Sequence, residues 1–142
     1  QGTIGRRYTF HMSPDKESFR NAPVCMEFIR GDTLLTSRYF KPDTFHLLAA
    51  DLPYDVQHGS TVNGRLAPKP EELLKDALPG WKRVLKTGGG LAIAWNEKRC
   101  PRNRMERLVS LEGLDVCEPP KEGFSHTVDT SITRNLLIAV KR

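Results

Sequence analysis

The sequence lacks the features that mark secreted, membrane or metal-binding proteins. Its three cysteines, Cys25, Cys100 and Cys117, form no C-x-x-C pair, so neither a disulfide framework nor a zinc site is predicted. No apolar run approaches the roughly 18 residues that a transmembrane helix needs, and the N-terminus has no secretory signal pattern. The four histidines share no metal-ligand spacing. We therefore expect a cytoplasmic protein with no metal and no membrane partner.

Aromatic residues are also scarce, at 8% of the chain, but the overall composition still predicts a globular unit. A hydrophobic content of 38% in 142 residues is enough for one core. The formal charge of +5 favours a polyanionic partner, although charge says nothing about fold. Residues 55–69 are polar and show no apolar periodicity, which predicts a long loop that is either functional or disordered.

Apolar periodicity and turn residues predict an α/β fold. Strands are predicted at 6–12, 24–30, 45–50, 91–95, 114–117 and 135–140. Helices are predicted at 14–21 with Ser13 as N-cap, at 33–40, at 70–86, and around Met105 up to Gly113. Within the third helix, Pro79-Gly80 is expected to kink or split the helix. The glycines at 88–90 precede a strand, which favours a structural turn over a phosphate-binding loop.

The most informative stretch is the apolar segment 45–50 with the four residues after it. The segment is short and bounded by polar residues, as expected for a strand that is buried in a sheet. Pro53 disfavours helical dihedrals at Leu52, so the chain turns there. The carboxylate of Asp51, the backbone carbonyl of Leu52 and the ring of Tyr54 thus meet at the carboxyl edge of the sheet. Open α/β sheets bind their ligands at this edge.

These residues, Asp51-Leu52-Pro53-Tyr54, resemble the Asp-Pro-Pro-Tyr signature of S-adenosylmethionine-dependent methyltransferases that modify exocyclic amines of nucleobases. Residues 26–32 resemble the strand and acidic turn that face the adenine of the cofactor in this superfamily. Residues 81–95 resemble its helix, glycine turn and following strand, and residues 124–140 fit the strand pair that ends such domains. Within the superfamily, the chain looks most like RNA methylases related to tRNA guanosine-N2 methyltransferases.

The resemblance implies a catalytic role for each residue of the signature. Asp51 would accept one N–H of the target amine, and the Leu52 carbonyl would accept the other. Pro53 would stiffen the turn, while Tyr54 would stack on the base, a contact worth on the order of 1 to 3 kcal/mol. Leucine stands here where the signature has its first proline, so the turn is expected to be held less rigidly.

The same resemblance implies S-adenosylmethionine as cofactor, with Asp32, Thr33 and Asp51 as its predicted contacts. The glycine-rich loop that holds the methionine part of this cofactor has no counterpart, because residues 2–5 run directly into a strand pattern. Residues 1–142 are therefore predicted to be the C-terminal part of a methyltransferase catalytic domain. The expected fold is a Rossmann-like class I methyltransferase sheet that lacks its first strand and glycine loop.

Loss of that central strand would leave the strand at 45–50 with an unpaired edge, which exposes backbone donors and acceptors. We expect a second chain or an N-terminal segment to complete the sheet, and the 142-residue chain alone to be inactive. A complete small domain with a different strand order is the alternative.

A run of basic residues follows the predicted strand at 91–95. Residues 96–107 hold five basic and two acidic side chains. The run begins at the carboxyl end of a strand, so it is expected on the same rim as Asp51, where it could contact RNA phosphates. The predicted nucleic-acid contacts are Lys98, Arg99, Arg102 and Arg104. A solvated helix face is the alternative interpretation.

The sequence thus predicts an S-adenosylmethionine-dependent N-methyltransferase that acts on an exocyclic amine of a nucleobase in RNA, with guanine in tRNA as the expected target. A DNA adenine or cytosine amino-methyltransferase is one alternative, and a catalytically incomplete RNA-binding module is another. Direct methyl transfer needs no enzyme nucleophile, because holding donor and acceptor in line can remove roughly 7 to 11 kcal/mol of barrier.

Overall fold

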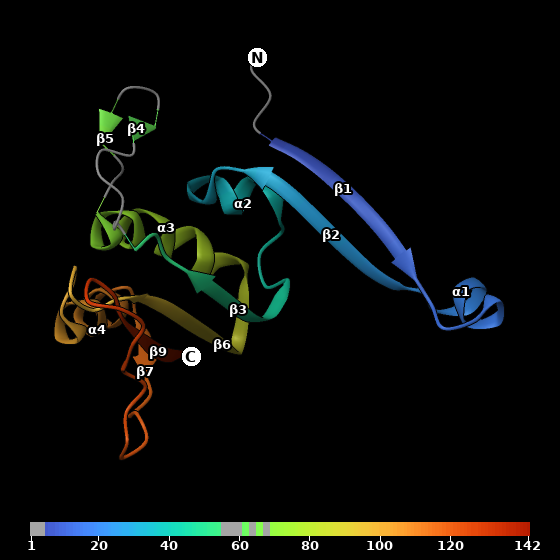
Figure 1. The fold of residues 1–142 in the computed structure, drawn as a ribbon. Coiled ribbons are helices and arrows are strands. Elements are labelled where there is room, and N and C mark those ends of the chain that lie inside the picture. Colours follow the sequence, from blue (N-terminus) through green and yellow to red (C-terminus); the bar gives the residue numbers. More distant parts are fainter. Residues whose placement is uncertain (1–4, 55–60, 63–64, 67–68) are drawn as a thin grey trace. The chain divides into compact units, whose positions relative to one another are not determined.

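A computed structural model describes residues 5–54, 61–62, 65–66 and 69–142. The chain divides into two compact units, Gln1–Leu35 and Thr36–Arg142. Figure 1 shows the helices and strands of both units. The loop predicted at residues 55–69 lies largely outside the described residues. Within it the structure describes two short antiparallel strands, β4 (Thr61–Val62) and β5 (Arg65–Leu66), and Lys69.

The first unit is a ribbon of two antiparallel strands, β1 (Gly5–Met12) and β2 (Val24–Gly31). The helix α1 (Lys16–Asn21) connects them, and one turn of 3-10 helix, η1 (Thr33–Leu35), follows β2. Both strands predicted for this part of the chain are thereby confirmed.

The helix α1 begins later than predicted, and its N-cap is Asp15, not Ser13. The Asp15 carboxylate accepts hydrogen bonds from the backbone N–H of Ser18 at 2.7 Å and from its hydroxyl at 2.9 Å. A carboxylate satisfies an unpaired donor of the first turn and also suits the positive end of the helix dipole. Pro14 therefore lies before the helix.

The pairing of β2 departs from the expectation for residues 26–32. The resemblance implied a strand of the same sheet as the strand that ends at Asp51. In the structure, β2 pairs antiparallel with β1 and with no other described strand. Strands that are close in sequence pair at low loop-closure cost, which favours this local ribbon.

The second unit is built around a five-stranded mixed sheet. Its strands are β3 (Phe45–Asp51), β6 (Leu85–Asn96), β7 (Leu114–Val116), β8 (His126–Thr127) and β9 (Thr133–Lys141). The order is β3-β6-β9-β7, and β8 also pairs with β9. β3 and β6 are parallel, whereas β9 runs antiparallel to β6, β7 and β8. The predicted α/β class and the strands predicted for this unit are confirmed.

One edge of this sheet is free among the described residues. β3 is the end strand and pairs with β6 alone, so its other side presents backbone N–H and C=O groups without a strand partner in that part of the chain. The unpaired edge expected for the strand at 45–50 is therefore present.

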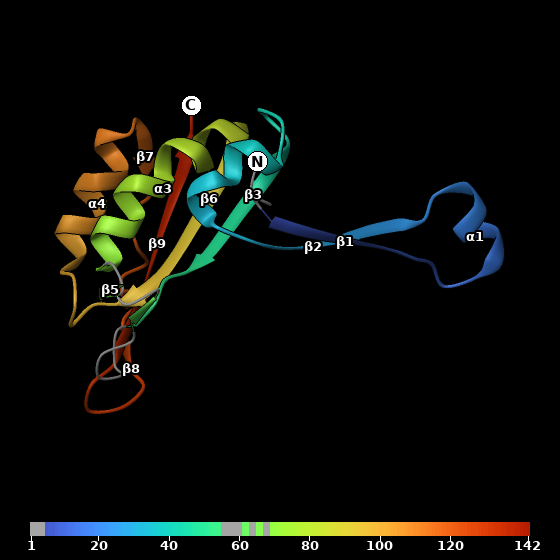
Figure 2. The same cartoon turned by 90° about the horizontal axis from the view of Figure 1, so that it is seen from above.

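Helices cover one face of the sheet, as Figure 2 shows. α3 (Pro70–Val84) and α4 (Arg102–Leu111) pack against each other and against strands, and the short α2 (Thr36–Tyr39) contacts α3. The largest buried side chains of this core are Leu74, Leu78, Leu85, Leu91, Ile93, Trp95, Met105 and Leu137. Gly113, at a φ of 81°, follows the end of α4, in agreement with the predicted helix end.

The opposite face of the sheet is lined by small and apolar side chains. Residues alternate along a strand, so Ala92 and Ala94 of β6 lie on the face opposite to the buried core. In register with them lie Ala49 of β3 and Leu136 of β9. Leu47, on the same face, is 64% exposed. The sheet surface near the carboxyl end of β3 therefore offers room for a ligand.

The helix α3 runs as one helix through Pro79, so of the two predicted outcomes, a kink or a split, the split does not occur. A proline inside a helix costs about 3 kcal/mol or more, because it removes one hydrogen bond and crowds a carbonyl. Leu78 and Trp81, on either side of Pro79, are both buried. Burial of each such side chain contributes about 1.5 to 3 kcal/mol, which offsets that cost.

α3 ends at Val84, earlier than predicted, and Leu85 is its C-cap. Gly88 lies inside β6 with a φ of 78°, near a shift in the register between β3 and β6. A Cβ atom at Gly89 would come within 2.7 Å of the Lys86 carbonyl oxygen. The predicted turn at residues 88–90 therefore lies inside β6, where the glycines permit an irregular strand instead.

Membrane-spanning helices and metal-binding clusters are both absent from the described residues. None of the helices in this part of the chain is long and apolar enough to cross a membrane. Nor, in the same residues, are three side chains of histidine, cysteine, aspartate or glutamate grouped so that they could hold a metal ion.

Candidate active site

The turn after β3 lies at the carboxyl edge of the sheet. Asp51 is the last residue of β3 and pairs in register with Ala94 of the parallel strand β6. The backbone N–H of Leu52 donates to the Ala94 carbonyl at 2.9 Å, which continues the ladder by one residue. The Asp51 side chain is exposed just where the sheet ends, as predicted from the sequence.

Leu52 anchors this turn in the core. Its side chain is only 4% exposed and belongs to the main hydrophobic cluster. A proline at this position has no N–H and could not donate to Ala94. Leucine therefore replaces the rigidity of a proline ring with a hydrogen bond and a buried side chain. Pro53, which follows, is exposed.

Asp51, Tyr54 and Arg134 form a chain of short hydrogen bonds. The Tyr54 hydroxyl donates to Asp51 Oδ1 at 2.7 Å, and Arg134 Nε donates to the same hydroxyl at 2.6 Å. The Arg134 guanidinium carbon also lies 5.2 Å from the centre of the Tyr54 ring, within the range of a cation–π contact. The phenol and the carboxylate are thereby held in one arrangement.

The phenol of Tyr54 is held in its protonated form. Partial burial, followed by the hydrogen bond to Asp51, raises the pKa of Tyr54 above its ordinary value of 10.0. The hydrogen bond from Arg134 acts in the opposite direction and lowers that pKa. At neutral pH Tyr54 is therefore a hydrogen-bond donor, in accordance with its bond to Asp51.

Asn96 ties the turn to the start of β9. It is fully buried at the end of β6, and its Nδ2 donates to the Tyr54 carbonyl at 3.3 Å and to the Ser131 carbonyl at 3.0 Å. Its Oδ1 accepts the backbone N–H of Thr133 at 3.1 Å and that of Lys98 at 3.3 Å. One amide therefore holds three segments of the chain together at this edge.

A pocket of about 320 Å³ lies beside the Asp51 carboxylate on the open face of the sheet. Its lining residues are Ala49, Ala50, Asp51, Ala92, Ala94, Arg134 and Leu136. The alanines leave space over the strands, while one carboxylate and one guanidinium supply opposite charges at the rim. Such a pocket suits a flat polar group with both donors and acceptors.

Lys98 and Arg102, two of the four predicted nucleic-acid contacts, each make hydrogen bonds within the protein. Lys98 Nζ donates to the Thr130 carbonyl at 2.6 Å. Arg102 donates to Glu106 at 2.7 Å and to the Leu136 carbonyl at 2.9 Å, and its side chain is 19% exposed. A phosphate contact by Arg102 would have to compete with these bonds.

The other two predicted contacts, Arg99 and Arg104, are exposed. Arg104 forms an ion pair with Glu71 at 2.9 Å, and its side chain is 61% exposed. The nearby thiol of Cys100 stays protonated at neutral pH, because burial and the Glu71 carboxylate raise its pKa to about 11. The role proposed for the basic residues stays a prediction.

Asp32 and Thr33, the predicted cofactor contacts other than Asp51, lie in the first unit, where η1 begins. Asp32 Oδ1 accepts the backbone N–H of Leu34 at 3.0 Å. Their role toward the cofactor also stays a prediction.

Two residues of the site, Arg134 and Asn96, were missed by sequence reasoning. Asn96 directly follows the apolar part of β6 and so lies at the same carboxyl edge as Asp51. That position was a usable signal. Arg134 pairs in register with Asn96, because β9 starts where the antiparallel β6 ends. This register cannot be read from the sequence.

Solved structures with a similar fold belong to a candidate DNA modification methylase from Thermus thermophilus. Its selenomethionine derivative has 17% identity and a TM-score of 0.53, over 78% of this chain and 52% of that chain. A structure of the same methylase complexed with S-adenosyl-L-methionine has 18% identity and a TM-score of 0.51, over 78% and 53%. A third structure of it has 16% identity and a TM-score of 0.51, over 78% and 52%.

This similarity establishes the fold. The chain has the α/β fold of a class I methyltransferase and spans about half the length of the methylase chains that it matches. That proportion is consistent with a partial domain, as predicted. No protein-family profile and no curated relative matches the sequence.

Proposed function

We propose that this chain belongs to an S-adenosylmethionine-dependent N-methyltransferase that acts on an exocyclic amine of a nucleobase, with guanine of tRNA as its substrate. The observation that carries this proposal is the joint placement of Asp51 and Tyr54 at the carboxyl end of β3, next to a pocket. The chemistry of an aromatic amine requires such a site, because the lone pair of the amine is delocalised into the ring and must be drawn out.

In the proposed complex, each group of the turn has one task. Asp51 Oδ1 is occupied by the Tyr54 hydroxyl, which leaves Oδ2 to accept an N–H of the target amine. The Leu52 carbonyl, which receives no hydrogen bond from the described residues, accepts the second N–H. Arg134 covers one face of the Tyr54 ring, so the base stacks on the other.

The pocket beside Asp51 is compatible with part of the cofactor. Its alanine lining leaves room, and the Asp51 carboxylate suits an ammonium or hydroxyl group. When bound, S-adenosylmethionine supplies an electrophilic methyl group. A structure of the matching methylase contains this cofactor, which supports the proposal. Asp32 and Thr33 are the further contacts that we propose.

A DNA adenine or cytosine amino-methyltransferase is the second candidate. It is favoured by the structural neighbours, which are described as DNA modification methylases. The net charge of +5 suits either nucleic acid. Three free cysteines agree with the cytoplasmic location that we propose for an RNA-modifying enzyme.

We further propose that another segment or chain pairs with the free edge of β3 and supplies the missing glycine loop. Calorimetric titration with S-adenosylmethionine tests this idea on the 142-residue chain and on a longer protein that contains it. We expect binding by the longer protein only. Absence of binding by both would contradict the enzymatic proposal and favour a nucleic-acid-binding module.

The substrate is tested by incorporation of a labelled methyl group into tRNA and into double-stranded DNA of matched base composition. Incorporation into tRNA, followed by nuclease digestion that identifies N2-methylguanosine, supports the first candidate. Incorporation into DNA alone would overturn it in favour of the second.

A further inference from the structure

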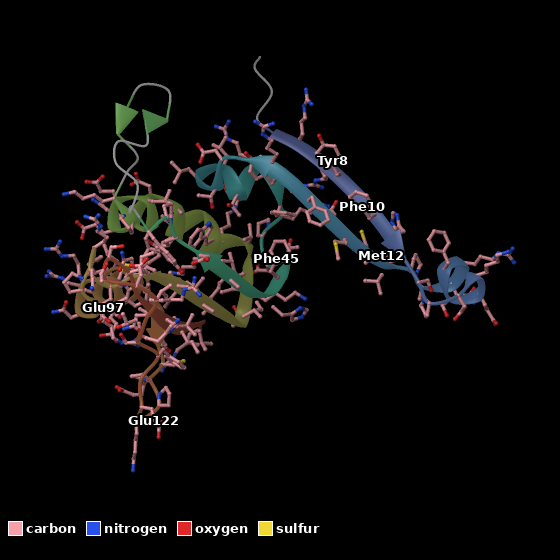
Figure 3. All side chains as sticks on the ribbon, in the orientation of Figure 1. Tyr8, Phe10, Met12, Phe45, Glu97 and Glu122 are labelled. Carbon is pink, nitrogen blue, oxygen red and sulfur yellow. The ribbon has the colours of Figure 1, made fainter. Side chains whose placement is uncertain are left out.

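The ribbon of β1 and β2 carries an apolar face without a covering layer in the unit to which it belongs. Six side chains share this face: Tyr8, Phe10, Met12, Val24, Met26 and Phe28. Their exposed fractions range from 41% at Met26 to 62% at Val24. Figure 3 shows Tyr8, Phe10 and Met12 following one another along β1.

The other face of the ribbon carries the polar side chains of Arg7, Thr9, His11 and Glu27, next to Cys25 and Ile29. Arg7 and Glu27 form an ion pair at 3.5 Å, and the Thr9 hydroxyl donates to Glu27 at 3.4 Å. The ribbon is therefore amphipathic. A two-stranded ribbon alone is at best marginally stable in water, so its apolar face is expected to have a partner.

Three of the six side chains on this face are aromatic. Tyr8 lies directly opposite Phe28, and Phe10 contacts Phe28 edge to face, with ring centres 5.7 Å apart at 86°. Same-face neighbours on a strand, such as Tyr8 and Phe10, are about 6.8 Å apart, whereas stacked bases in a duplex repeat at about 3.4 Å. Bases that stack on these rings must therefore be splayed apart, which a single strand permits.

Two arginines stand at one end of the same face. Arg6 of β1 pairs directly with Arg30 of β2, and like charges at opposed positions destabilise a strand pair. Among the described residues, neither arginine forms an ion pair. A bound anion would relieve this repulsion, and a phosphate is the anion that accompanies a base.

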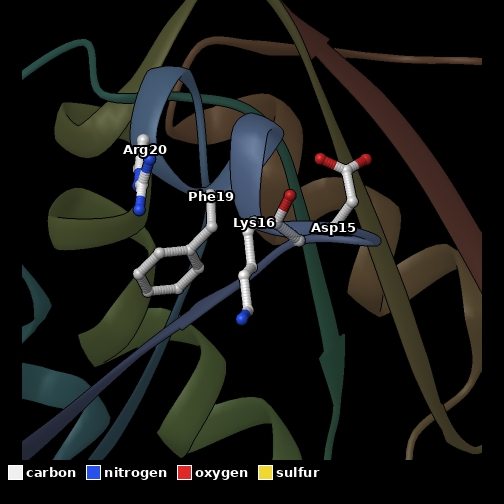
Figure 4. Close-up of a pocket in the computed structure, with 5 residues that line it drawn as sticks. Asp15, Lys16, Phe19 and Arg20 are labelled. Atoms are coloured by element: carbon white, nitrogen blue, oxygen red, sulfur yellow. The ribbon is translucent and has the colours of Figure 1, made fainter.

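The connection between β1 and β2, at the other end of the ribbon, also places an aromatic ring beside basic side chains. A pocket of about 390 Å³ is lined by Phe19, Lys16 and Arg20, together with Ser13 and Asp15, as Figure 4 shows. Phe19 is 50% exposed. The Asp15 carboxylate caps α1 and keeps its charge, but the two cations outnumber it among the lining side chains.

We propose that residues 5–31 form an arm that binds single-stranded nucleic acid. The bases stack on Tyr8, Phe10 and Phe28, and the phosphates contact Arg6, Arg30 and the cations of α1. The segment holds five basic and three acidic side chains, so it attracts a polyanion. A second copy that packed on this face with its strands in the same direction would bring two further arginines against Arg6 and Arg30, which disfavours that arrangement.

The test is a fluorescence-anisotropy titration of the whole chain with a short labelled oligouridine. We expect saturable binding that weakens between about 50 and 200 mM salt. Replacing Phe28 by alanine should weaken binding about 5- to 150-fold, the loss expected for one stacked base. Arg30→Gln should weaken binding and reduce the salt slope by about 0.7, the value for one phosphate contact on a single strand.

Two further variants keep the result interpretable if Phe28→Ala disturbs the ribbon. Tyr8→Ile removes the ring and keeps a β-branched apolar side chain that favours strands, and it should also weaken binding. His11→Ala, on the polar face of β1, should bind as the unmodified chain does. Equal affinity of Tyr8→Ile and the unmodified chain would overturn the proposal.

The same measurements distinguish single-stranded nucleic acid from other possible partners of this apolar face. Equal affinity for a duplex of the same length would contradict the requirement for splayed bases. Dimerisation in analytical ultracentrifugation that Phe28→Ala abolishes, without oligouridine binding, would assign the face to a second copy. Binding to vesicles of uncharged lipid, without binding to oligouridine, would likewise overturn the proposal.

This inference is independent of the proposed catalytic activity, because oligonucleotide binding is measured without cofactor. Binding of oligouridine without any methyl transfer would support the arm and contradict the proposed function. Methyl transfer by the unmodified protein, together with normal oligouridine binding by Tyr8→Ile, would support the proposed function and contradict the arm.

Discussion

Arg134 donates a hydrogen bond of 2.6 Å from Nε to the hydroxyl oxygen of Tyr54, 80 positions earlier in the chain. The same guanidinium lies 5.2 Å from the centre of the Tyr54 ring. The phenol in turn donates to Asp51. The position of the candidate catalytic carboxylate is thus connected to the start of β9.

Replacement of Arg134 by glutamine should raise the pKa of Tyr54 further, because the bond from Arg134 lowers that pKa. Absorbance titration of the phenolate measures this change, and Tyr54→Phe identifies the signal among the three tyrosines. Arg83→Gln, an exposed arginine of α3, is the matched control and should change nothing. An unchanged Tyr54 titration in Arg134→Gln would show that the pair does not form in solution.

The stability of the fold should depend on pH in the alkaline range. The folded state raises the pKa of Tyr54 above 10.0, so it binds the phenol proton more tightly than the unfolded state does. This contribution is complete below pH 10 and is lost as the pH rises through the folded pKa. Chemical denaturation at a series of pH values should show a smaller alkaline loss in Tyr54→Phe. An identical loss in both proteins would contradict this assignment.

Leu52 should be essential for stability. Leu52→Ala should lower the free energy of unfolding by about 2 to 5 kcal/mol, the range for a buried leucine. Leu52→Pro restores the signature but removes the N–H that donates to Ala94, and should cost about 1 to 3 kcal/mol. Urea denaturation measures both values. A stabilised Leu52→Pro variant would show that ring rigidity outweighs the hydrogen bond.

Asn96→Ala should loosen the candidate site. It removes four hydrogen bonds of a buried amide and should cost about 1 to 3 kcal/mol for each backbone group left unsatisfied. Asn103→Ala, at an exposed position of α4, serves as the control and should be neutral. Hydrogen exchange at Thr133 should accelerate in Asn96→Ala only. Unaltered exchange there would mean that Asn96 does not hold the start of β9.

Local patterns in the sequence predicted the elements that carry the site. An apolar run that ends in an acid and an X-Pro pair predicted β3 and its turn, and the side chains of Asp51 and Tyr54 do meet there. The partner Arg134 depends on the antiparallel register of β9 against β6, which is a tertiary property. Local rules also leave the outcome open where packing matters, as for Pro79, which does not split α3 because its buried neighbours offset its cost.

The ribbon of β1 and β2 also shows that local patterns predict strands but do not predict how the strands pair. Alternation of Tyr8 and Phe10 with polar residues predicted β1 correctly. Its partner strand was expected to belong to the central sheet, because a resemblance in sequence order does not specify strand pairing. Only the register revealed that Arg6 and Arg30 are opposed.

The central claim is that Asp51 positions a nucleobase amine for methylation. It is tested most directly by transfer of a labelled methyl group to tRNA, measured with the longest natural protein that contains these residues and with its Asp51→Ala variant. We predict a loss of about 100-fold or more for Asp51→Ala, since misplacement of a reacting group by about 1 Å has a cost of this size. Asp76→Ala, an exposed acid of α3, should keep full activity. Wild-type turnover by Asp51→Ala would contradict the account.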